Sequence, residues 1–252
     1  MIRAAALGDL PHGFLGRSGG VSTGILAGLN AGLGSGDERE AITENRRRAV
    51  DAVLPRARLV TVHQIHSADA IDAGDWPEDD RPHADALVTD RPGILLGILT
   101  ADCAPILLAD HDAGVIGAAH AGWRGAVAGV AANTIAAMEQ LGARRDRIAA
   151  AVGPCIAKAN YEVDQAFADR LLAIDPANER FFTDGSAGKP HFDLESFVFA
   201  SLAAAGITRI EALGQDTYAL PERFFSFRRA THLAEPDYGR QLSVIGLAWP
   251  QT

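Results

Sequence analysis

Two histidines and one cysteine are the residues best suited to chemistry in this chain. His66, Cys103 and His120 each close a short apolar run, in VTVHQIH, GILLGILTADC and GVIGAAH. Strand ends place side chains at the edge of a sheet, where sites tend to form, so we expect the three to meet. Two imidazoles and one thiolate suit zinc, and a fourth position left to water makes such a site catalytic. The spacings of 37 and 17 residues match no zinc-finger signature, so the residue types carry the prediction.

The same residues support two other chemistries. A Cys103–His120 pair would suit a nucleophilic hydrolase, with Asp102 either orienting a histidine or forming a turn. A blue-copper site also uses two histidines and a cysteine, with a weak axial methionine. Only Met1 and Met138 exist, and the chain's eight histidines are too few and scattered for the several coppers of a laccase. Copper is therefore the less favoured metal.

Two further segments have the composition of anion sites. The glycine-rich segment 16–24, GRSGGVSTG, would let backbone N–H groups converge, with Arg17 and Ser22 as added donors. It is neither a Walker A loop nor a GxGxxG motif, and a plain glycine-rich turn is the commoner interpretation. HAGWRG places Trp123 and Arg124 at a helix start, where Arg124 could hold an anion and Trp123 could stack on a ring. A core tryptophan and a surface arginine fit that pattern equally well.

Composition limits the function classes. The 252 residues are 48% hydrophobic and 22% charged, which is ordinary for a folded protein. A net charge of -9 makes nucleic acid and anionic membranes poor partners. No apolar run approaches the roughly 18 residues that span a bilayer, and two cysteines make no disulfide framework. We predict a cytoplasmic protein with one domain over residues 1–252 and a monomer as the default.

Both helices and strands are expected to position these residues. We predict helices at 37–54, 124–141, 163–174 and 193–206, the last with Asp193 as its N-cap. Short apolar runs predict buried strands, several of them antiparallel because their connections are too short for crossover helices. These runs are 57–64, 84–90, 93–103, 105–110, 114–122, 147–154 and 242–249. Polar stretches at 75–82 and 184–190 predict surface loops. An α+β protein with a large sheet system covered by helices accounts for the pattern.

Ordered motifs along most of the chain resemble the laccase-domain family, long labelled multicopper polyphenol oxidase and later recognised as purine nucleoside phosphorylases. The matching segments are GRSGGVSTGILAGLNAGLGSGDE, ENRRR, QIHSADA, ADALVTD, ILTADCAPILLAD, GAAHAGWRG, VGPCIAKANYEVD, FDLES, FFSFRR and GRQLSVIGL. So many matches in order are far more specific than any one motif. The resemblance implies a layered α/β/β/α fold, similar to that of the cytotoxic-necrotizing-factor catalytic domain.

The resemblance also implies a zinc site whose ligands double as the catalytic residues. The family's metal-binding histidine in Q-[VI]-H falls on His66 rather than His63, its A-D-C cysteine on Cys103, and its H-A-G-W-R-G histidine on His120. His63 is an extra histidine near His66 in the same run, and it could compete for the metal or contact the metal's ligands.

Residues of the implied substrate cleft come from other motifs of the family. Its T-R-x-G-G-V-S loop has Gly16 here in place of Thr, its S-L-N-L-G motif has Ala31 where Leu is common, and its N-R pair supplies Arg46. Arg17, Arg46 and Arg124 are the candidate phosphate donors. The candidate cleft residues are Arg17, Ser22, Asn30, Arg46 and Arg124.

The implied reaction is phosphorolysis of a purine nucleoside to its base and ribose 1-phosphate. Adenosine, inosine and guanosine are the expected substrates, and the family is also described as deaminating adenosine and cleaving methylthioadenosine. One departure is Asp216-Thr217, where the family often has Cys-Thr, and we interpret this position as structural. The alternatives are a Cys–His hydrolase, a copper-dependent polyphenol oxidase and a non-enzymatic partner in a larger assembly.

Overall fold

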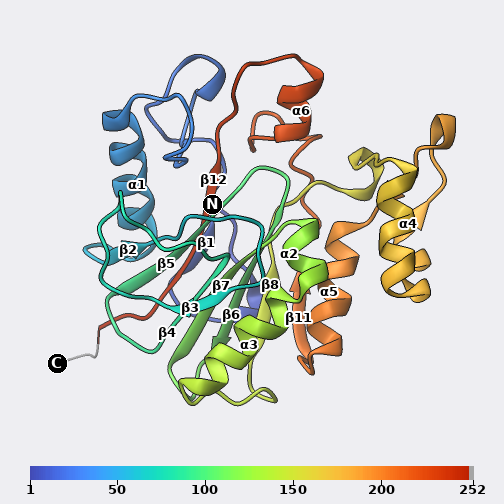
Figure 1. The fold of residues 1–252 in the computed structure, drawn as a ribbon. Helices are drawn as coiled ribbons and strands as arrows, with labels where there is room; N and C mark the ends of the chain where they lie inside the picture. The colour runs from blue at the N-terminus through green and yellow to red at the C-terminus, as the bar shows by residue number, and fades with distance from the viewer. Residues whose placement is uncertain (250–252) are drawn as a thin grey trace.

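A computed structural model describes residues 1–249 as two stacked sheets with helices on both outer faces (Figure 1). The four-stranded sheet has the order β1 (His12–Phe14), β12 (Gln241–Gly246), β5 (Ile94–Thr100), β2 (Arg58–Val60). The six-stranded sheet has the order β11 (Arg209–Ala212), β8 (Ala149–Val152), β6 (Ala104–Asp110), β7 (Val115–Ala121), β4 (Ala86–Thr89), β3 (Ala70–Asp72). A small separate pair joins β9 (Phe182–Thr183) to β10 (His191–Phe192).

The central strands are apolar along their whole length because both of their faces are covered. Every residue of β5, β6 and β7 is buried. Between the sheets, Leu96 and Ile98 of β5 belong to one core with Leu107 of β6 and Ile116 of β7. The antiparallel pairing of β6 with β7 agrees with the prediction from short connections. β5 and β12 also pair antiparallel, although they lie far apart in the chain.

Helices close both outer faces of the two-sheet stack. Helix α1 (Arg39–Val53) packs on the four-stranded sheet in a core that includes Ala49 and Leu95. Helices α3 (Val130–Gln140) and α5 (Leu194–Ala204) cover the six-stranded sheet. The predicted layered α/β/β/α arrangement is therefore confirmed.

Helix boundaries differ from the prediction at one point of consequence. The helix predicted over 124–141 is wrong as one piece: it is α2 (Trp123–Ala128) followed by α3, with Gly129 between them at φ 93°. Only glycine adopts that conformation at little cost. Helix α4 (Gln165–Ile174) and α5 match their predicted ranges, and Asp193 caps α5 by accepting from the Ser196 N–H.

Shorter helical pieces complete the described chain. Helix α6 (Phe227–His232) was not expected from the sequence, and Ser226 caps it. Single 3-10 turns occupy Ala5–Leu7, Gly24–Leu26, Lys158–Asn160, Pro176–Phe181 and Ser186–Gly188. None of the helices in residues 1–249 combines the length and the apolarity that crossing a membrane requires.

Candidate metal centre and active site

The structure brings the two histidines and the cysteine together. The ligand atoms of His66, Cys103 and His120 lie within 4.8 Å of one another. Cys103 Sγ is 3.9 Å from His66 Nε2, and the two imidazole rings meet edge to face. Tetrahedral zinc, with bonds of 2.0 to 2.3 Å, would separate such atoms by about 3.5 Å. A small contraction would therefore close this group around a metal ion.

Three different elements supply these side chains. His120 lies on β7, opposite Pro105 of β6. Cys103 occupies the tight turn between β5 and β6. His66 lies in the loop after β2, in the left-handed region at φ 62°. Because a non-glycine residue adopts that conformation only when its surroundings enforce it, something must hold the loop in place.

Asp85 holds both histidines, and the sequence analysis missed it. Its buried carboxylate accepts hydrogen bonds from the backbone N–H groups of Ile65, His66 and Ser67 at 2.6–3.1 Å. It also lies 2.7 Å from His120 Nδ1. This contact directs Nε2 of His120 toward Cys103 and a metal. The available signal was an aspartate immediately before a buried strand in HADALVTD.

Electrostatics favour the charged forms of the group. Burial acts to raise the pKa of the Cys103 thiol, but the charge and hydrogen bonds of His120 and His66 outweigh it and lower that pKa to about 7. Burial acts to lower the pKa of His120, yet Cys103 and Asp85 raise it to about 9. For Asp85, burial is outweighed by hydrogen bonds from His120 and Ser67, which bring its pKa to about 2. A thiolate is the form in which cysteine binds metals.

Asp102 does not orient a histidine, so that hypothesis is wrong. Its carboxylate accepts from Thr217 Oγ1 at 2.6 Å, from Ser226 Oγ at 3.0 Å and from the Arg228 N–H at 2.7 Å. It therefore joins the β5–β6 turn to the start of α6. Because Cys103 is its chain neighbour, this anchoring also fixes the turn that presents the thiol.

Gly122 leaves room for the side chains of His66 and Cys103. A Cβ there would lie 2.8 Å from His66 Cδ2 and 2.9 Å from Cys103 Sγ, whereas the backbone has an ordinary φ of -69°. Gly122→Ala should therefore displace two ligands without straining the backbone. We expect metal affinity to fall about tenfold or more, measured by competition with a chelator. Gly36→Ala, whose Cβ would contact only Asp237 at 3.5 Å, is the matched control. Equal metal affinity of both variants and the wild type would contradict the geometry.

Two cavities meet at the candidate ligands. The first, of about 540 Å³, is lined by His66 and Cys103 together with aromatic side chains, among them Trp123, Tyr161, Phe167 and Phe227. The second, of about 280 Å³, is also lined by His66 and Cys103, and its other lining residues include Arg81, Thr100 and Arg240. Of the five predicted cleft residues, Arg124 lines the first cavity, with its guanidinium 4.8 Å from the Trp123 ring.

The other predicted cleft residues line neither cavity. Arg17 donates to the carbonyls of Ala27 and Pro221 and lies over the Phe225 ring. Ser22 Oγ donates to Asp37 at 2.6 Å. The fully buried Asn30 amide also donates to Asp37, at 2.8 Å. Their side chains are engaged in the packing of the N-terminal loops.

The glycine-rich segment 16–24 forms a plain turn, the commoner of the two interpretations of its sequence. A Cβ at Gly20 would lie 2.1 Å from the Gly28 carbonyl oxygen, so this glycine allows two backbone segments to touch. Ser22 and Gly28 exchange backbone hydrogen bonds there. The segment is a compact turn in which the N–H group of Ser22 is already used.

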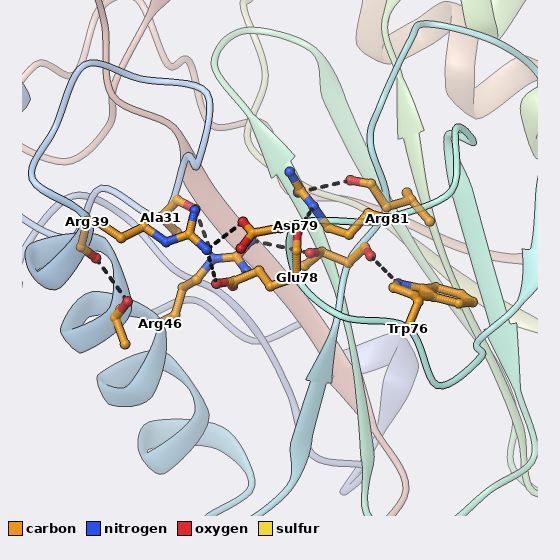
Figure 2. A network of polar contacts seen from close by, with 10 residues as sticks. Ala31, Arg39, Arg46, Trp76, Glu78, Asp79 and Arg81 are labelled. Carbon is orange, nitrogen blue, oxygen red and sulfur yellow. Dashed lines mark hydrogen bonds and ion pairs between the residues drawn. The ribbon is translucent and has the colours of Figure 1, made fainter.

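Arg46 lies in a separate polar network (Figure 2). Its buried guanidinium donates to the Ala31 carbonyl and pairs with Glu78, and Glu78 is bound in turn by Arg39. The Glu78 carbonyl accepts from Arg81 Nε at 2.9 Å. The network therefore attaches the predicted surface loop 75–82 to α1 and fixes the chain next to the second cavity, which Arg81 lines.

Replacing Arg46 should consequently affect stability. Arg46→Met removes charged hydrogen bonds to Ala31 and Glu78, and we expect the free energy of unfolding to fall by about 2–3 kcal/mol, measured by urea denaturation. Arg47→Met, on the exposed side of the same helix, should cost under about 0.5 kcal/mol. An Arg46→Met protein of wild-type stability with weakened phosphate binding would instead place Arg46 in the cleft.

His63 and Asp216, two residues singled out in the sequence, have separate positions. His63 stacks on His83 with ring centroids 4.7 Å apart and lines the second cavity, outside the group of three. Asp216 accepts from the Ala157 N–H and from Asn160 Nδ2, which is a structural role in a loop.

Comparisons with known proteins agree along nearly the whole chain. A family model described as multi-copper polyphenol oxidoreductase laccase matches residues 11–248. A purine nucleoside phosphorylase of Deinococcus radiodurans is 41% identical over 98% of this chain and 92% of its own. Another of Corynebacterium glutamicum is 38% identical over 93% of each chain.

Solved structures give the same picture. The crystal structure of a Neisseria meningitidis protein superposes with a TM-score of 0.84 at 33% identity, over 94% of this chain and 93% of that one. YlmD from Geobacillus stearothermophilus gives 0.83 at 29% identity, over 98% and 94%.

Proposed function

Because the chain belongs to the multi-copper polyphenol oxidoreductase laccase family, we propose that it is a purine nucleoside phosphorylase, the name its curated relatives carry. The reaction transfers the ribosyl group of adenosine, inosine or guanosine to phosphate. The observation that carries the proposal is the His66–Cys103–His120 group at the edge of an aromatic cavity of about 540 Å³. That volume falls within the range of small-ligand sites.

The cavity lining suits a nucleoside. Tyr161 and Phe227 offer ring surface to a purine, and Phe227 is half exposed at the rim. Trp123 also lines the cavity, with its ring packed edge to face on Phe167 and the guanidinium of Arg124 4.8 Å from it. Arg124 and Arg228 also line this cavity and supply donors for ribose hydroxyls.

We propose zinc as the resident metal. Its ligands would be His66, Cys103 and His120, whose donor set of two imidazoles and one low-pKa thiol fits zinc and leaves one position open. When bound, zinc supplies a Lewis acid that lowers the pKa of water or polarises a substrate oxygen. Asp85 holds the His120 ring and the His66 backbone in the orientation that this requires.

Copper is a weaker proposal for this chain. The residues that the structure describes contain one group of three metal-ligating side chains, whereas a laccase needs several coppers. Met138, the only internal methionine, is fully buried in α3 against Gly117 and is unavailable as an axial ligand. A Cys103–His120 hydrolase is the second candidate, favoured by the thiol pKa of about 7. It predicts that alkylation of Cys103 abolishes a metal-independent activity.

The experiment is product analysis with adenosine, in the presence and absence of phosphate, on protein of measured metal content. Adenine that appears only with phosphate supports phosphorolysis. Inosine formed without phosphate supports the adenosine deamination that we propose as a second activity, and cleavage of methylthioadenosine is tested in parallel. We further propose a cytoplasmic monomer with one domain and no nucleic-acid partner, consistent with the net charge of -9. Adenosine, inosine and guanosine that all stay unchanged with phosphate present would overturn the phosphorylase assignment.

A further inference from the structure

The second cavity contains an unusual pair of polar atoms. Among the described residues, two buried side-chain polar atoms have no hydrogen-bond partner, Thr100 Oγ1 and Arg240 Nη1. Both residues line this same cavity of about 280 Å³. Buried polar groups without partners are rare because they are costly, so two beside one cavity call for a partner there, such as a ligand or an ordered water.

Two arginines give this cavity a fixed positive charge. Arg81 and Arg240 line it, and its lining includes no aspartate or glutamate. The chain as a whole carries a net charge of -9, so this concentration of cations runs against the general balance. A cavity with cationic walls and no carboxylate favours an anion.

Arg240 is held in place without a counter-ion. Its guanidinium lies 4.4 Å from the Tyr238 ring, and its backbone N–H donates to Asn30 Oδ1. The side chain also packs so closely on Gly32 that a Cβ there would lie 3.0 Å from Arg240 Cδ. Within residues 1–249 no carboxylate forms an ion pair with Arg240. A fixed, unpaired guanidinium is preorganised for an oxyanion.

Arg81 is fixed in a similar way. Its Nε donates to the Glu78 carbonyl and its Nη1 to the Val62 carbonyl, and no hydrogen bond within the described chain uses its Nη2. Figure 2 shows how the network around Glu78 ties this loop to α1. Arg81 therefore presents a second donor to the cavity from a different element.

We propose that this second cavity is the phosphate subsite, with Arg240 as its main anchor and Arg81 and Thr100 as further donors. The inference rests on the proposed phosphorolysis. The two cavities share His66 and Cys103, so phosphate in one would approach a nucleoside in the other. An oxygen of hydrogen phosphate bonds to C1′ as the C1′–N9 bond breaks. The electron pair of the C1′–N9 bond stays on the purine, and the purine takes the proton of hydrogen phosphate.

This assignment replaces the arginines predicted from the sequence. Arg17 and Arg46 are committed to other partners, and Arg124 lines the aromatic cavity instead. The cationic side of the site comes from GRQLSVIGL and from the polar loop 75–82, two segments to which the sequence analysis gave no role in binding.

The test compares Arg240→Gln with Arg144→Gln. Arg144 is an exposed arginine that pairs with Asp146 on the surface. We expect Arg240→Gln to raise KM for phosphate by about tenfold or more, with little change in KM for the nucleoside and unchanged metal content. Arg144→Gln should match the wild type. A second variant, Thr100→Val, keeps the side-chain shape and removes only the hydroxyl. It should raise KM for phosphate severalfold.

Direct binding separates this inference from the proposed function. Titration of the metal-loaded protein with inorganic phosphate, followed by phosphorus NMR, should show binding that Arg240→Gln weakens, even if no nucleoside is cleaved. In that case the subsite stands and the phosphorylase proposal fails. Phosphorolysis with an unchanged KM for phosphate in both Arg240→Gln and Thr100→Val would overturn the subsite alone. Absence of phosphate binding by the wild type at millimolar phosphate would also overturn it.

Discussion

Cys103→Ala is expected to remove the bound metal and reduce nucleoside cleavage by more than about a hundredfold, while the protein remains folded. The thiolate is the only anionic ligand in the group, and two imidazoles alone hold zinc far more weakly. The side chain lies in a half-buried turn outside the hydrophobic clusters, so its loss should cost little stability. Metal analysis, steady-state kinetics and thermal unfolding of the same preparation measure the three effects.

Cys155→Ala is the matched control. Cys155 is buried in the core under the six-stranded sheet, and burial raises its pKa well above the ordinary value, so it cannot replace the lost thiolate. Its substitution should lower stability modestly and leave metal content and activity intact. A metal-free Cys103→Ala protein with full activity would contradict the assignment of this group.

Asp85→Asn is expected to weaken metal binding by about 10- to 100-fold without touching a ligand. The carboxylate accepts from the N–H groups around His66 and from His120 Nδ1, and an amide cannot accept all of these hydrogen bonds. The His120 ring would lose the partner that sets its tautomer, and the His66 loop would be released from its left-handed conformation. Chelator competition measures the affinity.

A buried carboxylate elsewhere separates this effect from general destabilisation. Asp110 is as buried as Asp85 and pairs with Arg147 at the far end of β6. Asp110→Asn should destabilise the fold while retaining wild-type metal affinity. Equal metal affinities in Asp85→Asn and the wild type would show that Asp85 positions no ligand.

Much of the fold was accessible from sequence because the central strands are short, apolar and bounded by turn residues. The layer order is what the family resemblance implied, whereas helices α1, α4 and α5 follow from periodicity, with Asp193 marking the start of α5. The stretch 124–141 was predicted as one helix because it is rich in small residues that can pack closely on a sheet. At Gly129 the left-handed φ decides otherwise, and that depends on how α2 and α3 pack rather than on propensity.

The site was predictable only where residue type determines chemistry. Two histidines and a cysteine are residue types that bind metals, so they were candidate ligands, and the family resemblance assigned them to zinc. The structure brings them together. The roles of arginines and carboxylates depend on which partner each finds in three dimensions. Asp102 and Asp85 both lie beside apolar strands, yet one anchors α6 and the other orders the histidines. Arg46 and Arg240 differ likewise: Arg46 is paired with Glu78, whereas Nη1 of Arg240 has no hydrogen-bond partner within residues 1–249.

The most direct measurement is phosphorolysis of inosine by the chelator-stripped protein as zinc is added back. The account predicts no activity without metal, a linear recovery, and a plateau near one zinc per chain, because one group of His66, Cys103 and His120 serves the reaction. Full phosphorolysis by the metal-free protein, or recovery only with several coppers per chain, would contradict it.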